Sequence, residues 1–375
     1  MSKAFDTKNS STKTLEQLGW CPHFETALRQ DERQQVKVAR VSLTEKQQYR
    51  ISSPEGEFRA VVTGRFRHLA PHPADFPTTG DWVIYDRESR DELALIREVL
   101  PRKSRIARMV AGRRSDEQLI AANVDHIFIV TGLDDNFNLR RIERYLCVCR
   151  DSGATLWIVL NKADLLQNRS EVLKRVEETR LGCPFILTSS YTGEGLELLR
   201  QAIRPGQTVG FIGSSGVGKS SLINALMNLT VATTAEVRSS DSRGRHTTTQ
   251  REMYFSDEGI ILMDTPGMRE LQLTANEDSV RENFADIALL AMQCRFADCS
   301  HTHEPDCAVR ASIEEGLMEA GRLENQNKQL KEVHFQENRG NKRESSLGKK
   351  RWKSRTQLIR NIKKDGSDAN TDLYH

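Results

Sequence analysis

The spacing of apolar residues changes along the chain, and it first predicts a β-rich region. From Gln35 to about residue 100, apolar and polar side chains alternate with a period of two, which is typical of half-buried strands. We expect strands over residues 36–41, 49–52, 58–63, 81–85 and 93–100. Five short strands at this spacing predict a small OB-like barrel, with a generic small sandwich as the alternative.

After residue 118 the chain instead shows short apolar runs that alternate with helical stretches. The apolar runs cover residues 124–130, 156–160, 185–188, 208–212 and 259–263. The helical stretches cover residues 139–150, 171–179 and 220–227. This alternation is typical of a parallel sheet with helices on both faces, so we expect an α/β domain.

The two ends of the chain show little apolar periodicity. These ends and the two patterned regions described above divide the chain into parts, five in all. We expect a polar N-terminal tail with one short helix (1–34), the OB-like barrel (35–102) and the α/β domain (103–273). A small, mainly α domain follows (274–335), with a helical stretch over residues 309–331, and then a basic C-terminal tail (336–375).

The strongest motif for chemistry is GSSGVGKS at residues 213–220, between a predicted strand and a predicted helix. In this phosphate-binding loop, glycines let backbone N–H groups turn toward phosphates, and the helix N-terminus adds positive potential. We expect Lys219 to reach the β- and γ-phosphates as a catalytic residue and Ser220 to hold Mg²⁺. The predicted nucleotide-binding residues here are Gly213, Ser214, Ser215, Gly216, Val217, Gly218, Lys219, Ser220 and Ser221.

A second motif, Asn161-Lys162-Ala163-Asp164, ends a predicted buried strand and indicates which base is bound. The Asp164 carboxylate can accept hydrogen bonds from guanine N1–H and the 2-amino group, which adenine lacks. Asn161 and Lys162 are predicted to bind the nucleotide with it. A simple helix cap is the alternative for Asp164. Ser189, in Thr188-Ser189-Ser190, is a further candidate for a backbone contact with the base.

Two later segments are expected to face Mg²⁺ and the γ-phosphate. In DTPG at residues 264–267, Asp264 would act on Mg²⁺ through water and the Gly267 amide would sense the γ-phosphate. A Pro-Gly turn without such a role is the alternative. The polar stretch 239–250 contains GRHTTT and is expected to be a switch segment, with Thr248 as a candidate Mg²⁺ ligand.

The order of these motifs is unusual, because the guanine motif precedes the phosphate loop by about fifty residues. The same sheet can form if the chain is circularly permuted, since termini often lie close together in space. The Asp264–Gly267 segment would then lead directly into the C-terminal domain.

That domain contains a cysteine and histidine cluster made of Cys294, Cys299, His301 and Cys307. Three thiolates and one imidazole form a tetrahedral structural zinc set with no open position, so we assign the ion to folding. His303 competes with His301 as the fourth ligand. A redox-active or merely buried cysteine cluster is the alternative.

Composition and charge refine this picture in three ways. No apolar run reaches the length of about 18 residues that a transmembrane helix needs, and the first residues do not form a secretory signal. Seven cysteines argue against a complete disulfide framework and favour the cytoplasm. The net charge of +3 conceals an uneven distribution. Residues 331–375 hold 12 basic and 6 acidic residues, whereas the rest of the chain holds 43 basic and 46 acidic residues.

Two basic segments are therefore candidates for contacts with nucleic acid. Residues 101–114 carry six basic residues and no acid, and the C-terminal tail is expected to contact phosphate backbones. A solvated linker and a solubilising tail are the respective alternatives.

The motifs together, with QLIAANVD at 118–125 and Gly80-Asp81-Trp82-Val83, resemble those of the RsgA (YjeQ) family of circularly permuted bacterial GTPases. The resemblance covers about residues 35–325 and implies an OB domain, a permuted GTPase domain and a zinc domain. It also implies a monomer that binds GTP and GDP and assists late assembly of the small ribosomal subunit. Contact with rRNA, hydrolysis stimulated by the subunit, and release driven by hydrolysis are implied as well.

The residue that positions the attacking water is not evident in the sequence. Met268 follows Gly267 where Ras-like GTPases place a water-positioning Gln, and an apolar side chain cannot orient water. We therefore expect slow intrinsic turnover that needs outside help. His246 is the catalytic candidate by similarity to the family's GRHTT segment, with a loop or RNA contact as its alternative. An RNA-binding protein with a GTP-gated clamp is the competing function, and Asp164 disfavours an ATP-dependent enzyme.

Overall fold

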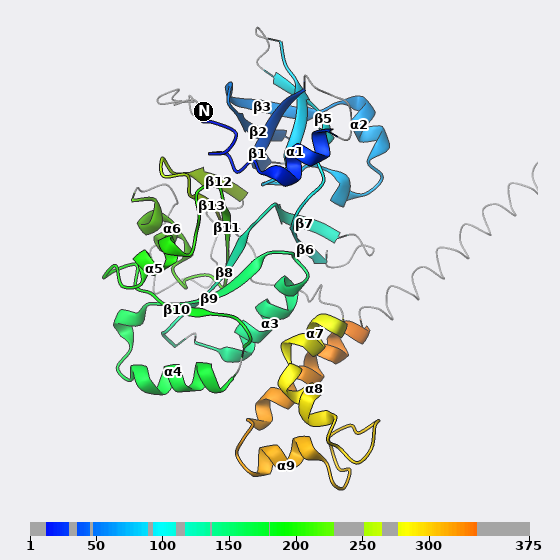
Figure 1. Ribbon diagram of the computed structural model, residues 1–375, viewed down its shortest axis with the longest axis vertical. Coiled ribbons are helices and arrows are strands. Elements are labelled where there is room, and N and C mark those ends of the chain that lie inside the picture. The colour runs from blue at the N-terminus through cyan, green and yellow to red at the C-terminus, as the bar shows by residue number, and fades with distance from the viewer. Residues whose placement is uncertain are drawn as a thin grey trace, which may run out of the picture.

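The computed structural model describes residues 13–29, 36–45, 48–88, 93–109, 117–135, 137–179, 181–228, 251–264 and 277–335, and the statements below concern these residues. They form a small barrel, an α/β domain and a helical C-terminal domain that follow one another along the long axis of the molecule (Figure 1). None of the described helices is both long and apolar enough to cross a membrane.

The first of these parts is a closed five-stranded barrel. Its strands are β1 (Lys37–Glu45), β2 (Gln48–Ser53), β3 (Gly56–Val62), β4 (Trp82–Asp86) and β5 (Leu93–Val99). They pair in the order β1-β2-β3-β5-β4, and pairing of β4 with β1 closes the barrel. Helix α2 (Gly64–Leu69) and the 3-10 turn η1 (Pro73–Asp75) connect β3 to β4. The predicted OB-like barrel is thereby confirmed, and the sandwich alternative is wrong.

Residues 13–29, which we assigned to a polar tail, are folded against this barrel. They include α1 (Pro22–Arg29), and their Leu18 and Phe24 side chains are buried in a cluster with Trp82 of β4. The apolar residues in this segment are few but fall on one side, so they form a packed face that the polar composition concealed.

The α/β domain contains five parallel strands: β8 (His126–Gly132), β9 (Thr155–Asn161), β10 (Phe185–Leu187), β11 (Thr208–Ile212) and β13 (Ile261–Asp264). Their order is β10-β9-β8-β11-β13, and they carry α3 (Leu139–Arg150), α4 (Arg169–Glu178), α5 (Leu196–Gln201) and α6 (Lys219–Met227). Alternate residues of β8 enter two different buried clusters, as expected for a sheet covered on both faces. The predicted α/β architecture is confirmed.

Three strands were not predicted from the sequence. β6 (Arg105–Met109) and β7 (Glu117–Ala122) form a hairpin, and β6 lies in the basic segment that we read as a boundary. β12 (Arg251–Phe255) runs antiparallel to β13 and also pairs with β1 of the barrel, through Leu43–Glu252 and Thr44–Arg251. The barrel and the α/β domain therefore share one continuous sheet.

The C-terminal domain is helical, with α7 (Glu277–Asn283), α8 (Ala285–Ala291), α9 (Ala308–Glu314) and a further helix over residues 320–335. We predicted one helical stretch over residues 309–331, but the helix ends after Glu314 and a second begins at residue 320. Gly316, with a φ of +73°, supplies the left-handed conformation that terminates the first helix. α7 packs against α3 of the α/β domain (Figure 1).

Candidate functional site

The phosphate loop lies between β11 and α6, as the sequence predicted, and two of its glycines are required by close contacts. A Cβ atom on Gly218, whose φ is +95°, would lie 2.3 Å from Nδ2 of Asn161. A Cβ atom on Gly213 would lie 2.3 Å from the carbonyl oxygen of Val130 in β8. The loop therefore fits against the neighbouring strands only because these positions lack side chains.

Lys219, the first residue of α6, folds its ammonium group over this loop. Its Nζ donates to the carbonyl oxygens of Gly213 at 2.8 Å and Ser214 at 2.7 Å. A cation held at this point, above backbone N–H groups at a helix N-terminus, creates a local site for phosphate oxygens. Ser220 and Ser221 lie in the first turn of the same helix.

The guanine motif and the phosphate loop are in direct contact, although about fifty residues separate them in the sequence. Asn161, at the end of β9, is fully buried and donates from Nδ2 to the carbonyl oxygen of Val217 at 2.9 Å. Its Oδ1 accepts a hydrogen bond from the Thr188 hydroxyl at 3.2 Å. Asn161 thus ties three predicted segments of the site together.

Asp164, the residue predicted to read the base, is held by Ser189. The Ser189 hydroxyl donates to Oδ1 of Asp164 at 2.5 Å and accepts from the backbone N–H groups of Tyr191 and Thr192. The predicted contact of the Ser189 backbone with the base stays a prediction, and the Ser189 side chain has a further contact that was not predicted, with the Asp164 carboxylate.

Lys162 of the motif adopts the left-handed conformation, with a φ of +65°, and its Nζ lies 2.6 Å from Oδ2 of Asp134. Sequence reasoning did not identify Asp134. Its position could have identified it, because Asp134 lies two residues beyond the end of β8, at the same end of the parallel sheet as the other motifs.

The residues predicted for Mg²⁺ are only partly described. Asp264 ends β13, is 6% exposed, and pairs in register with Phe211, two residues before the phosphate loop. The oxygen atoms of Ser220 and Asp264 are the ligand type that Mg²⁺ prefers, so the donor set fits this ion. His246, Thr248 and Gly267 lie outside the described residues.

The four predicted metal ligands of the C-terminal domain come together in space. One ligand atom each from Cys294, Cys299, His301 and Cys307 lies within 4.8 Å of the others. Nδ1 of His301 is 3.4 Å from Sγ of Cys307, whereas Nε2 of the competing His303 contacts the Thr302 hydroxyl. These four residues could hold a metal ion, and a set of three thiolates and one imidazole suits zinc.

The loop that carries these ligands is organised by Glu304. Its carboxylate accepts hydrogen bonds from the Ser300 hydroxyl and from the backbone N–H groups of Ser300, Thr302 and His303. These donors hold the pKa of Glu304 well below its usual range. The loop between Cys299 and Cys307 is thus partly formed by its own hydrogen bonds.

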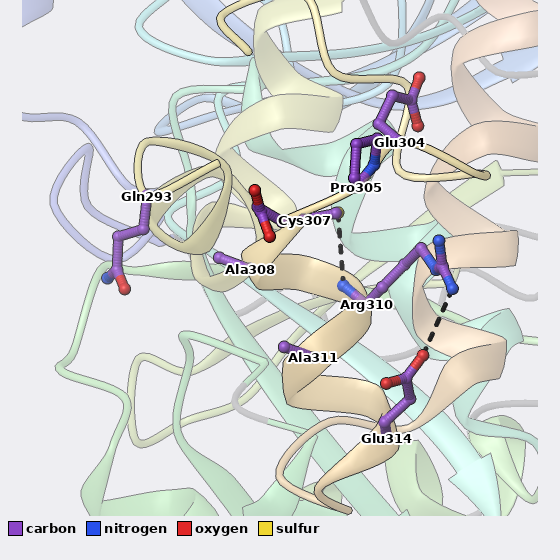
Figure 2. A pocket seen from close by; sticks show the side chains of 9 residues that line it. Gln293, Glu304, Pro305, Cys307, Ala308, Arg310, Ala311 and Glu314 are labelled. Carbon is purple, nitrogen blue, oxygen red and sulfur yellow. Dashed lines mark hydrogen bonds and ion pairs between the residues drawn. The ribbon is translucent and has the colours of Figure 1, made fainter. Parts of the chain in front are cut away.

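A shallow pocket of about 420 Å³ flanks Cys307 (Figure 2). Arg310, on its wall, donates from its backbone N–H to Sγ of Cys307 and pairs through its side chain with Glu314. The pocket contains none of the residues of the nucleotide motifs, so it belongs to the surroundings of the metal centre.

Comparison with known proteins matches this geometry to one family. The family model described as RsgA GTPase matches residues 99–274. A second model, described as ABC transporter, matches residues 196–364, a span that includes the phosphate loop but excludes the guanine motif. The second match therefore concerns phosphate binding, which ATP- and GTP-binding proteins share.

Curated relatives match over most of the chain. The small ribosomal subunit biogenesis GTPase RsgA 2 of Vibrio parahaemolyticus is 40% identical over 96% of this chain and 96% of its own length. The RsgA 2 protein of Lactiplantibacillus plantarum is 45% identical over 77% of this chain and 81% of its own.

Solved structures agree with these relatives. YjeQ from Thermotoga maritima is 25% identical, with a TM-score of 0.58, over 80% of this chain and 99% of its own. YloQ, described as a circularly permuted GTPase, has the same fold, with a TM-score of 0.56 and 22% identity over 81% of this chain and 97% of its own.

Proposed function

The chain belongs to the RsgA family of small ribosomal subunit biogenesis GTPases, and on that premise we propose that it hydrolyses GTP as a late assembly factor of this subunit. In this proposal the subunit stimulates hydrolysis, and hydrolysis drives release. The observation that supports a guanine-specific GTPase best is the direct bond from Asn161 to the phosphate loop, beside an Asp164 carboxylate fixed by Ser189.

In this proposal different residues bind different parts of GTP. The oriented Asp164 carboxylate accepts two hydrogen bonds from guanine, and an adenine base would leave it without donors. The backbone N–H groups of the loop and the Lys219 ammonium bind the β- and γ-phosphates and stabilise the charge that develops there. Ser220 and Asp264 would hold Mg²⁺, which supplies further neutralisation of the phosphate charge when it is bound.

We assign the metal of the C-terminal domain as zinc with a structural role, because four protein ligands leave no open position for catalysis. The proposed partners are the small subunit, its rRNA, GTP and GDP, with the protein acting as a monomer in the cytoplasm. The barrel and the basic segment 101–114 are candidates for contacts with RNA phosphates. Within this segment, Arg102 and Lys103 already form ion pairs with Asp81 and Asp125, and residues 110–114 lie outside the described residues. The basic tail after residue 335 is a further candidate that lies outside the described residues.

The decisive experiment measures GTP hydrolysis with and without isolated small ribosomal subunits. We expect a slow basal rate, a rise of at least tenfold with subunits, and competition by GDP but not by ATP. A single-turnover rate that subunits leave unchanged would favour the alternative, an RNA-binding clamp gated by GTP without significant catalysis.

The water-positioning residue can be tested in the same assay. We propose His246, and His246→Ala is expected to reduce the subunit-stimulated rate by about 100-fold while GTP affinity stays within a few-fold of wild type. Full stimulated activity in this variant would assign His246 to a loop or RNA contact instead.

A further inference from the structure

We propose that Arg141 is a positioning residue for nucleotide binding and that, through it, helix α3 couples the phosphate loop to the C-terminal domain. The inference rests on the proposed function, because it takes the loop as the GTP site. Arg141 lies outside both nucleotide motifs, and it donates from Nη1 to the hydroxyl oxygen of Ser214, the second residue of the loop, at 3.2 Å.

Arg141 is fixed at both its backbone and its side chain. Asn138, the cap of α3, accepts a hydrogen bond from the Arg141 backbone N–H at 3.1 Å, and the half-buried guanidinium reaches Ser214. The carbonyl oxygen of Ser214 accepts from Lys219 at 2.7 Å. Ser214 is thus held between two cations, so Arg141 restrains the residue whose carbonyl orients the phosphate-binding ammonium.

Neighbouring residues of α3 contact the C-terminal domain. Arg144 lies one turn after Arg141 on the same side of α3, and Glu143 lies on the opposite, buried side; both reach the helix at residues 320–335. The buried carboxylate of Glu143 accepts from Arg322 at 2.5 Å, and Arg144 makes two hydrogen bonds to Glu332, at 2.6 and 2.9 Å.

These contacts make α3 and the C-terminal domain one rigid unit. Arg322 is 3% exposed and also donates to Asp286 at 2.6 and 2.8 Å and to the carbonyl oxygen of Asn283. Separating the domain from α3 would break the buried ion pair between Glu143 and Arg322 and expose it to water, although Arg140 and Asp286 would still pair with these two side chains. Displacement of the phosphate loop is therefore linked to displacement of the C-terminal domain, and the linkage acts equally in both directions.

The first experiment measures GDP affinity for a mutant cycle in the full chain. Arg141→Met is expected to weaken GDP binding about five- to tenfold and Ser214→Ala about threefold. Because both remove the same hydrogen bond, the double variant should bind no more weakly than Arg141→Met. Arg175→Met, which removes an exposed positive charge from α4 of the same domain, is the matched control and should bind as wild type does.

Several outcomes would overturn the positioning role. Wild-type affinity in Arg141→Met would do so, and so would fully additive losses in the double variant, which would indicate long-range attraction between the guanidinium and the phosphates. A loss of the single-turnover rate at saturating GTP without a loss of nucleotide affinity would also contradict the proposal, because it assigns Arg141 to nucleotide binding. Ser214→Ala keeps the test valid if Arg141→Met folds poorly.

The second experiment measures coupling by amide hydrogen exchange in residues 320–335. Saturating GDP is expected to slow exchange there several-fold in the wild type and to have little effect in Arg141→Met, even though the nucleotide site is full in both. Equal slowing in both proteins would refute coupling through Arg141. A wild-type protein that does not bind GDP at all would instead refute the proposed function.

Discussion

Single residues are expected to determine which nucleotide is bound and how the parts of the chain are connected. Asp164 is the clearest case for nucleotide specificity. In the proposed function its carboxylate distinguishes guanine from adenine, and the Ser189 hydroxyl donates a hydrogen bond to it. Specificity should therefore depend on the identity of residue 164 and, to a smaller degree, on the Ser189 hydroxyl.

We expect Asp164→Asn to weaken GTP binding by about 100-fold or more, because the amide places a donor opposite the donors of guanine. The same variant should gain affinity for xanthosine triphosphate, whose 2-carbonyl accepts from that amide. Ser189→Ala should lower the affinity for GTP about fivefold and should not raise the affinity for xanthosine triphosphate. Competition binding with the three nucleotides checks this, and unchanged GTP affinity in Asp164→Asn would exclude Asp164 as the base-reading residue.

Arg40 shows how one side chain can connect three parts of the chain. It is fully buried in β1 and donates to the carbonyl oxygens of Leu18, Gly80 and Asn123, which belong to the N-terminal segment, the barrel and the α/β domain. Burial lowers the pKa of Arg40 to about 10, so the side chain still carries its charge at neutral pH.

Arg40→Met should lower the free energy of unfolding by about 3 kcal/mol, because three buried carbonyl groups lose charge-assisted hydrogen bonds. Arg97→Met removes an exposed ion pair with Asp86 and should cost less than about 1 kcal/mol. Urea unfolding of the two variants gives the comparison. Equal losses would mean that the buried carbonyl contacts contribute little.

At the scale of elements, the sequence predicted type and order well wherever apolar periodicity was strong. The buried runs of β8, β9 and β11 and the helix after the phosphate loop appear where the pattern placed them. The prediction from sequence failed where pairing with a distant strand determines the structure. β12, with the sequence REMYF, and the charged hairpin β6–β7 have weak patterns of their own and become strands through neighbours distant in sequence.

The candidate site was predictable to a similar extent. Motif residues were found because glycine, lysine and carboxylate spacings reflect the chemistry of phosphate and guanine binding. The contact of the Ser189 side chain with Asp164 was missed, as were Asp134 and Arg141, because these contacts depend on side chains that meet across the fold.

The phosphate loop itself offers a test at this scale. Gly218→Ala should weaken GDP binding by at least tenfold, since the new methyl group would collide with Asn161 and separate the loop from the guanine motif. Gly193→Ala also adds a methyl group at a positive φ, but nothing lies within 4 Å of it, so only backbone strain is expected. Calorimetric titration of both variants with GDP distinguishes collision from strain.

The metal-binding loop provides the next prediction. Removal of the ion by a chelator should expose residues 295–306 to proteolysis, because bonds from the ion to the three cysteines and His301 would no longer hold the loop together. GDP affinity should change less than threefold, since none of the nucleotide motifs lies in this loop. Readdition of Zn²⁺ should restore protease resistance, and loss of GDP binding on chelation would show a dependence that the described contacts do not provide.

At the scale of the whole molecule, the shared sheet implies that barrel and α/β domain unfold together. β1 and β12 are paired, Arg50 of the barrel forms an ion pair with Glu252 at 3.0 Å, and the Thr79 hydroxyl donates to the Arg251 carbonyl oxygen. One variant would keep Trp82 in the barrel as its single tryptophan, and a second would keep Trp157 in the α/β domain. Tryptophan fluorescence should report the same urea transition in both variants. Separate transitions would mean that the pairing is too weak to join the two parts.

The pairing of β12 with β1 also covers one edge of the α/β sheet. An open parallel sheet normally ends in two edge strands whose unpaired backbone groups can recruit another chain. Here one edge is the three-residue β10, too short to template much pairing, and the other is covered by a barrel that closes on itself. The barrel thus serves the GTPase sheet as a built-in guard against aggregation, whatever else it binds.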